Sequence, residues 1–173
     1  MRAWPFSTPG VKRDASLLLA QVTQASRERA FFGPDRVPDT LEGRFELVAV
    51  FAALALIRLR LAKEGEPLAQ MFVDLLFRDL DSGLREDGVG DLAVSKRVHK
   101  LASAFYGRLD AYAGALEDED REALKGALAR NVRGCGHVFA ATLAEHVRRV
   151  AAVQASAPWE HLLTGETWPD FAT

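Results

Sequence analysis

Histidine and cysteine are the first candidates for chemistry in this 173-residue chain, because they ligate metals and act as bases and nucleophiles. The four histidines are His99, His137, His146 and His161. Their spacing contains no HExxH pair, and Cys135-Gly136-His137 lacks the first cysteine of a c-type haem attachment motif. His137 and His146 lie nine residues apart on one predicted helix, which is poor ligand geometry. We therefore predict no metal site and no cofactor.

A nucleophile is also poorly supported. The candidate serines, Ser82, Ser95 and Ser103, fall in predicted helices or at helix caps, not on the strained turn that exposes a nucleophile. The single cysteine, Cys135, has only Arg133 and His137 nearby to activate it. We therefore predict no catalytic residue and no enzymatic activity.

Gly88-Val89-Gly90 is the remaining candidate for chemistry, as a loop that holds a phosphate. No predicted strand precedes it, the third glycine is missing, and Asp91 would place negative charge where a phosphate would lie. Gly88 and Gly90 instead supply the positive φ angles of a tight turn between helices, and Asp91 or Ser95 caps the helix that follows.

Two apolar stripes flank this turn and predict a helical hairpin. The first stripe consists of Leu68, Met71, Phe72, Leu75, Leu76, Leu80 and Leu84. The second consists of Val98, Leu101, Ala102, Phe105, Leu109 and Tyr112. Both have the spacing of three and four residues that brings side chains to one face of a helix.

The hairpin carries more aromatic and charged residues than packing requires, and phenylalanine, tyrosine and arginine are enriched in interface hot spots. The candidate partner-binding residues are Phe77, Arg78, Asp81, Arg85, Lys96, Arg97, Tyr106 and Arg108. Phe105 lies on the apolar stripe and is predicted to be core. Two readings of the charges remain open: a ladder of pairs within each helix on a solvated face, or a polar frame around a groove that receives another chain.

Composition limits the class of protein. The formal net charge of −2 argues against a nucleic-acid binder. One cysteine allows no internal disulfide, which fits a reducing compartment, and the first residues do not resemble a secretion signal. The most apolar run, Leu47 to Ile57, is eleven residues long, whereas a spanning helix needs about 20. We expect a cytoplasmic protein whose central helix is this run, with peripheral contact at a membrane left open.

The chain as a whole predicts an all-α, single-domain bundle of about six or seven helices, with no persuasive strand. We expect a flexible lead-in (residues 1–10), a helical domain (11–163) and a C-terminal tail (164–173). Besides the hairpin, helices are expected over 11–30, 39–63, about 116–132 with Gly134 as cap, and 137–155, followed by a short helical turn after Pro158.

Three features outside the hairpin have two readings each. Phe31-Phe32 either plugs the core or forms an exposed latch for a partner. Arg58, Arg60 and Lys63 either oppose the helix dipole or form a basic rim. The tail with Trp168 either straps the core or anchors at a membrane interface.

The hairpin also resembles a known family, the ubiquinol–cytochrome c chaperones, which are assembly factors for respiratory complex III. The matching segments are Phe77-Arg78-Asp79-Leu80-Asp81, Leu84-Arg85-Glu86, Gly88-Val89-Gly90-Asp91-Leu92, Lys96-Arg97 and Ala104-Phe105-Tyr106-Gly107-Arg108. The match is strong over roughly residues 40 to 115, and Ser95 stands where the family often has proline.

The resemblance implies a non-catalytic chaperone that binds newly made cytochrome b, an apolar membrane subunit, until complex III assembles. We expect a bacterial protein because no mitochondrial-type extension is seen, and the client would then emerge at the cytoplasmic side of the inner membrane. Whether a small co-chaperone is needed stays open. The competing reading is a helical carrier that encloses a quinone or lipid. A carrier predicts a closed apolar cavity of several hundred Å³, and a binding module predicts an exposed patch.

Overall fold

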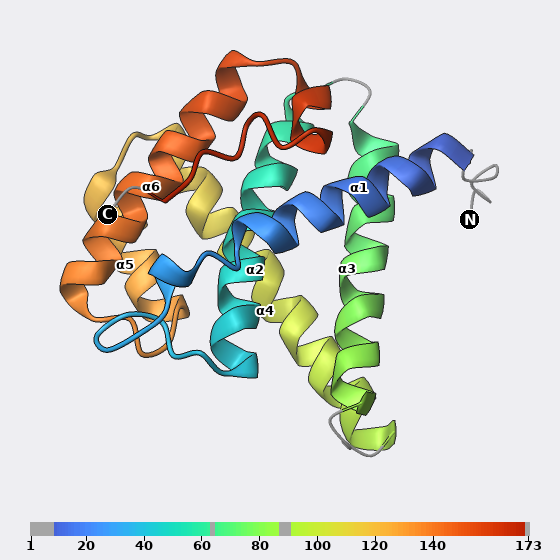
Figure 1. Cartoon of the computed structure of the whole chain (residues 1–173), viewed down its shortest axis with the longest axis horizontal. Helices are drawn as coiled ribbons and strands as arrows, with labels where there is room; N and C mark the ends of the chain where they lie inside the picture. Colours follow the sequence, from blue (N-terminus) through green and yellow to red (C-terminus); the bar gives the residue numbers. More distant parts are fainter. Residues whose placement is uncertain (1–8, 63–64, 87–90, 172–173) are drawn as a thin grey trace.

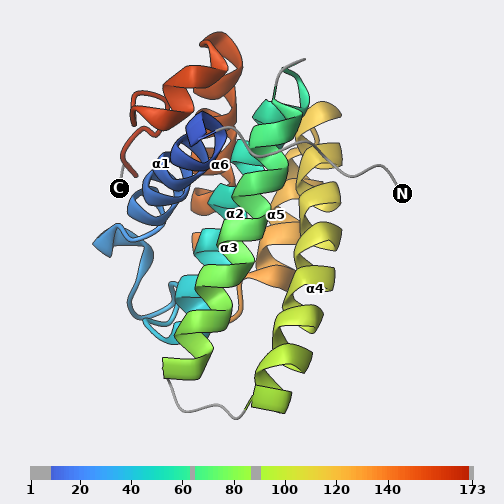
Figure 2. The ribbon, with the colours of Figure 1, turned by 90° about the vertical axis from the view of Figure 1, so that its right-hand side faces the viewer.

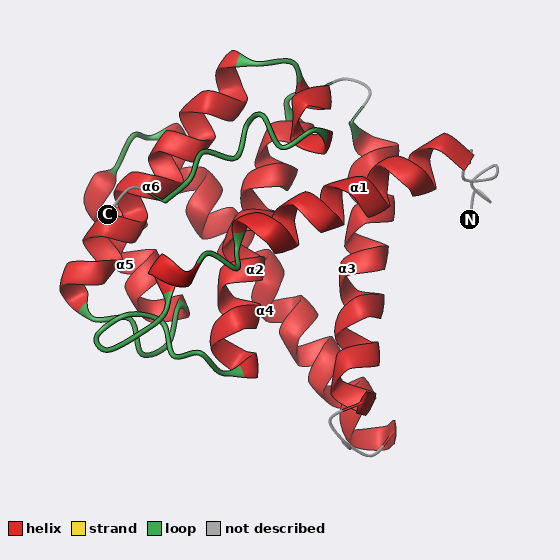
Figure 3. Ribbon diagram, in the orientation of Figure 1, coloured by secondary structure: helices red, strands yellow, loops and turns green. Residues whose placement is uncertain are grey.

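The computed structural model describes residues 9–62, 65–86 and 91–171; the side chains of residues 9, 83–86 and 91–95 lie outside that description. Its helices are α1 (Pro9–Ala25), η1 (Arg29–Phe31), α2 (Leu41–Arg60), α3 (Glu66–Glu86), α4 (Asp91–Glu117), α5 (Arg121–Asn131), α6 (His137–Ser156) and η2 (Trp159–Leu163), where η marks a 3-10 helix. The described residues contain no strand beyond one isolated bridge between Phe32 and Val37 (Figure 3). The predicted all-α class is confirmed.

Helix α2 lies at the centre and contacts α1, α3, α4, α6 and η2 (Figure 1). It is buried on all sides because its residues between Leu47 and Leu56 are apolar, and only Val48 among them is half-buried. Thr40 starts the helix as predicted, since its hydroxyl accepts a hydrogen bond from Gly43 N at 3.1 Å. No described helix is long and apolar enough to cross a bilayer.

Helices α3 and α4 form the predicted pair and lie side by side (Figure 2). Their facing stripes are buried at Leu68, Phe72, Leu76, Phe105, Leu109 and Tyr112. The predicted turn glycines, Gly88 and Gly90, lie outside the described residues. Asp91 begins α4, but its side chain also lies outside the description.

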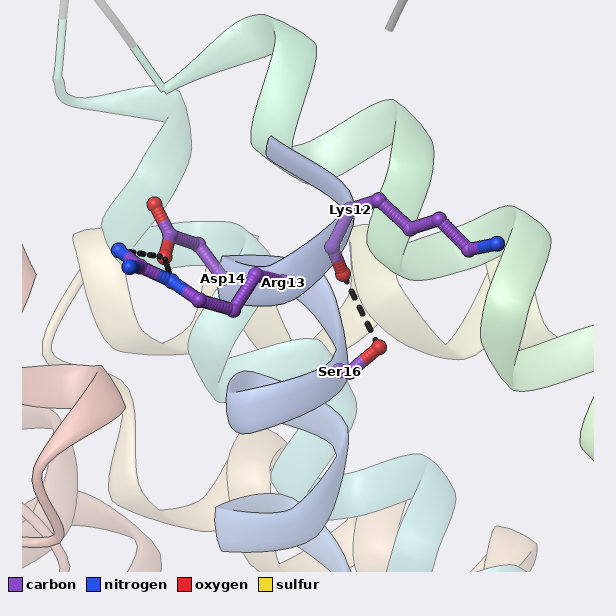
Figure 4. Close-up of polar contacts among 4 residues, drawn as sticks. All are labelled: Lys12, Arg13, Asp14 and Ser16. Carbon is purple, nitrogen blue, oxygen red and sulfur yellow. Dashed lines mark hydrogen bonds and ion pairs between the residues drawn. The ribbon is translucent and has the colours of Figure 1, made fainter. Parts of the chain in front are cut away.

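The N-terminal helix differs from its predicted range of 11–30. It begins at Pro9, so the expected lead-in overlaps it by two residues, and residues 1–8 lie outside the description. It ends at Ala25 because Arg27 N bonds back to Gln24 O, which tightens the chain into a turn before η1. On its exposed face, Ser16 Oγ donates to Lys12 O at 3.0 Å, and Arg13 pairs with Asp14 (Figure 4).

Two helix ends also differ from prediction. Helix α2 stops at Arg60, three residues before Lys63, because Leu61 N and Ala62 N bond three residues back and close the last turn. Helix α4 continues to Glu117.

The four acidic residues 117–120 therefore lie where α4 ends and α5 begins. Glu119 has a positive φ of 54°, and the carboxylate of Asp120 caps α5 by accepting from Ala123 N at 2.9 Å. The C-cap of α5 is Val132, and Gly134, predicted as the cap, takes its positive φ of 79° two residues later in the turn.

The C-terminal segment 164–171 lies against the core as a strap. Trp168 Nε1 donates to Leu162 O at 3.0 Å, and Phe171 N donates to both carboxylate oxygens of Glu28, at 3.1 and 3.0 Å. Phe171 is buried with its ring centroid 4.6 Å from that of Phe31. Phe31 plugs the core, and Phe32 is half-buried beside it.

Candidate functional site

The charges of α4 pair with the central helix α2. Arg108 Nη2 donates to Glu46 Oε1 at 3.0 Å, and Nη1 lies 2.8 Å from Oε2 without the alignment of a hydrogen bond. Arg97 Nη2 donates to Glu42 Oε1 at 2.8 Å on the surface. Both pairs join two helices, so these two arginines form neither a ladder within α4 nor a free frame.

The remaining predicted charges differ in exposure. Arg78 and Lys96 are exposed, and Asp81 is half-buried. The side chain of Arg85 lies outside the description. Among the charged candidates whose side chains are described, Arg108 is turned inward, with its side chain 12% exposed.

The predicted aromatic residues gather around Phe105, which is fully buried as expected. The ring of Phe77 on α3 meets it edge-on with a centroid separation of 5.7 Å. The ring of Tyr106 meets it at the same centroid separation. Phe77 is half-buried, whereas Tyr106 is 45% exposed. Tyr106 is therefore the aromatic candidate that can contact another molecule without rearrangement.

Tyr106 lines a groove of about 470 Å³ between α2, α3 and α4, which we call the tyrosine groove. Its other lining residues include Leu56, Leu59, Ala69 and Val73. The groove is open to solvent rather than enclosed.

A second and larger groove of about 610 Å³ lies between α2, α4 and α6. Five of its lining residues are alanines, Ala113, Ala115, Ala151, Ala152 and Ala155, and we call it the alanine groove. Its charged lining residues are Arg58, Arg60, Glu117, Glu119 and Arg148. Leu61, which is 74% exposed, also lines it.

The two grooves meet at Arg60, which lines both and pairs with Asp110 across 3.6 Å. Tyr106, Asp110, Ala113 and Glu117 follow one another on one face of α4, at the three- and four-residue spacing of a helix. The face of α4 beside the end of α2 thus joins the two grooves over about three turns, and it carries the exposed Arg60–Asp110 pair and Glu117.

Sequence reasoning missed the alanine groove. The sequence predicts that Arg58 and Arg60 form either a basic rim or a helix-end signal. In the structure each of the two arginines takes a different one of these roles. Arg58 Nε donates to Gln154 O and Nη2 to Ala157 O, both at 2.7 Å, so Arg58 caps the end of α6. Arg60 lies on the rim. Lys63 lies outside the described residues.

Two of the groups considered for catalysis, Cys135 and His146, have pKa values that make them poorly suited to it. Burial raises the pKa of the Cys135 thiol to about 11, so it stays protonated near neutral pH. His146 is buried among the rings of Phe31, Phe51 and Phe171, and burial lowers its pKa to about 4. No group of three metal-ligating side chains occurs in the described part of the chain.

Comparisons with known proteins agree with this helical architecture. The family model "Ubiquinol-cytochrome C chaperone" matches residues 36–170, which extends well beyond the hairpin. The crystal structure of the Cbp3 homolog from Brucella abortus is 34% identical in sequence, with a TM-score of 0.79, and the match covers 93% of this chain and 90% of that one. A search of curated proteins gave no match.

Proposed function

This chain belongs to the ubiquinol–cytochrome c chaperone family, and we propose that it is a non-catalytic assembly chaperone for the ubiquinol–cytochrome c reductase, complex III. Its client is newly made cytochrome b, a very apolar membrane subunit. It acts at the cytoplasmic face of a bacterial inner membrane, in peripheral contact with the bilayer.

The match of the family model over residues 36–170 carries this proposal. The architecture supports it, because a chaperone that holds a client must offer apolar surface while staying folded itself. The tyrosine and alanine grooves offer such surface, and the core of the bundle is packed with the buried side chains of the chain itself. Exposed charges at Arg78, Lys96 and Arg97 border the same hairpin.

The carrier reading is less well supported, because both grooves are open rather than enclosed. A carrier of a quinone or lipid would surround most of its ligand with apolar walls. An open apolar groove with a charged rim instead suits an interaction with another polypeptide.

The experiment is a pull-down from membranes of a bacterium that contains complex III. We expect cytochrome b to copurify with the tagged chain, and we expect a deletion strain to contain less assembled complex III. Normal complex III in the deletion strain, or a pull-down without cytochrome b, would remove the support for this function.

A variant at Tyr106 tests whether the hairpin surface contacts the client. Tyr106→Glu places a charge in the tyrosine groove, and we expect it to reduce the cytochrome b that copurifies. Ala104→Glu is the matched control, because Ala104 is also exposed on α4 but lies about 200° around the helix. Equal recovery of cytochrome b with both variants would exclude the tyrosine groove as a contact.

A further inference from the structure

The floor of the alanine groove has the composition of a helix-binding surface. Ala113 and Ala115 of α4 line it together with Ala151, Ala152 and Ala155 of α6. Small side chains allow the backbone of another helix to approach closely, which is the packing found where hydrophobic helices associate in membranes. Ala152 and Ala155 are exposed, so no described element of this chain covers them.

A buried amide in this groove lacks a partner. Gln154 is 2% exposed and lines the groove, and its Nε2 has no hydrogen-bond partner among the described residues. Its backbone carbonyl is already used by Arg58. An unpaired buried donor is costly, and native proteins retain few of them. A ligand that places a hydrogen-bond acceptor beside Gln154 Nε2 would therefore gain a favourable hydrogen bond.

The charges beside Gln154 also favour a ligand that carries hydrogen-bond acceptors. Arg148 lines the groove and forms no ion pair with any described residue. Glu117 and Glu119 also line the groove and are exposed, so they can stay solvated. The last carbonyl groups of a helix lack partners within that helix, and its carboxyl end carries partial negative charge. An amide donor and a cation above an apolar floor complement such an end.

We propose that the alanine groove binds the carboxyl-terminal turns of a hydrophobic α-helix of the client. The apolar side chains of that helix cover the alanine floor, and its last carbonyl groups accept hydrogen bonds from Gln154 Nε2 and Arg148. The identity of the client rests on the function proposed above, whereas the chemistry of the groove does not.

The first test measures the affinity of purified protein for a synthetic probe. The probe is a 20-residue leucine–alanine helix with lysines and a fluorophore at its amino end and an amidated carboxyl end, in a mild detergent. Ala152→Trp fills the groove from an exposed position, and we expect affinity to fall at least tenfold. Ala104→Trp is the control, because Ala104 is exposed on α4 nine residues before Ala113 and lines neither groove, and we expect it to bind as the wild type does.

Gln154→Leu separates a binding role from a packing role. Removing an unpaired buried donor should raise the melting temperature, whereas losing the hydrogen bond to the probe should lower affinity about fivefold. A purely structural residue would not shift stability and binding in opposite directions.

Several outcomes would overturn the proposal. One is wild-type affinity of Ala152→Trp, with helical content unchanged by circular dichroism. Another is a groove that binds oleate or a short-chain quinone while the helical probe fails to bind, which would make the occupant a small molecule.

The pull-down distinguishes this inference from the proposed function. If wild-type protein copurifies cytochrome b and Ala152→Trp does so equally, the function stands and the groove assignment fails. If wild-type protein recovers no cytochrome b, the function fails, and the probe experiment still decides the chemistry of the groove.

Discussion

Arg108 of α4 and Glu46 of α2 form an ion pair inside the bundle, with side chains that are 12% and 8% exposed. One hydrogen bond of 3.0 Å joins them, and a second nitrogen and oxygen lie 2.8 Å apart. Burial raises the pKa of the Glu46 carboxyl, and the charge of Arg108 opposes that shift. The pair therefore fixes the contact between α2 and α4 at the cost of removing two charges from water.

Removing one partner of this pair should be strongly destabilising. We expect Arg108→Met to lower the free energy of unfolding by about 3 kcal/mol, because Glu46 then stays buried without its cation. The double variant Glu46→Leu with Arg108→Met should recover most of that loss. Urea denaturation followed by circular dichroism measures both. Arg97→Met is the control, and it should cost less than about 1 kcal/mol because the Arg97–Glu42 pair is exposed. Equal losses for Arg97→Met and Arg108→Met would contradict this view of burial.

Acid should destabilise the protein through His146. Its pKa is lowered from 6.5 to about 4 by burial and then by Arg149, so the folded protein holds the imidazole neutral. Between pH 6.5 and 4 the unfolded chain therefore binds more protons, and the His146 contribution to stability falls as the pH falls. The loss should reach about 3 kcal/mol near pH 4. His146→Leu should flatten this part of the pH profile of unfolding, and an unchanged profile would show that other groups control it.

Glu28 should hold the strap against the core. Its two carboxylate oxygens share one bifurcated hydrogen bond from Phe171 N, and Glu28→Gln replaces a charged acceptor with a neutral one. We expect amide hydrogen exchange in residues 164–171 to become about fivefold faster, while exchange in α2 stays unchanged. Glu160→Gln, at an exposed glutamate, should have no effect. Unchanged exchange in Glu28→Gln would mean that the aromatic contacts of Phe171 hold the strap by themselves.

Two helical glycines should respond in opposite ways to alanine. A Cβ on Gly43 would lie 2.0 Å from Pro38 O, so Gly43→Ala forces the loop before α2 to move and should lower the melting temperature. A Cβ on Gly107 meets nothing within 4 Å, so Gly107→Ala should stabilise α4 by about 0.5 to 1 kcal/mol. Thermal unfolding of both variants is the measurement. A stabilised Gly43→Ala variant would show that Pro38 can move away at little cost.

Local patterns were sufficient to predict the helices themselves. The stripes at Leu68 to Leu76 and Phe105 to Tyr112 predicted two facing helices, and the unbroken apolar run from Leu47 predicted the buried centre. These signals depend on spacing along one segment, which the helical period converts directly into a face. Helix ends were less predictable, because Ala25 and Arg60 are followed by residues that could have continued a helix.

The candidate site depended more on contacts between distant segments. Tyr106 was singled out by residue type and position, and it is exposed in a groove. Arg108 was singled out on the same grounds, yet it is turned inward, where it pairs with Glu46, 62 residues earlier. The pattern of α4 alone contains no information about which charge on α2 it will meet.

The sequence by itself determined the helical class, the central apolar helix and, through its motifs, the family. Only the tertiary structure decided that Arg58 would cap α6, that Gln154 Nε2 would be buried without a partner among the described residues, and that alanines of α4 and α6 would form one groove. The physical reason is that a helix stripe reflects neighbours three or four residues away. A groove is instead formed by residues that are distant in the chain and become neighbours only when the helices pack.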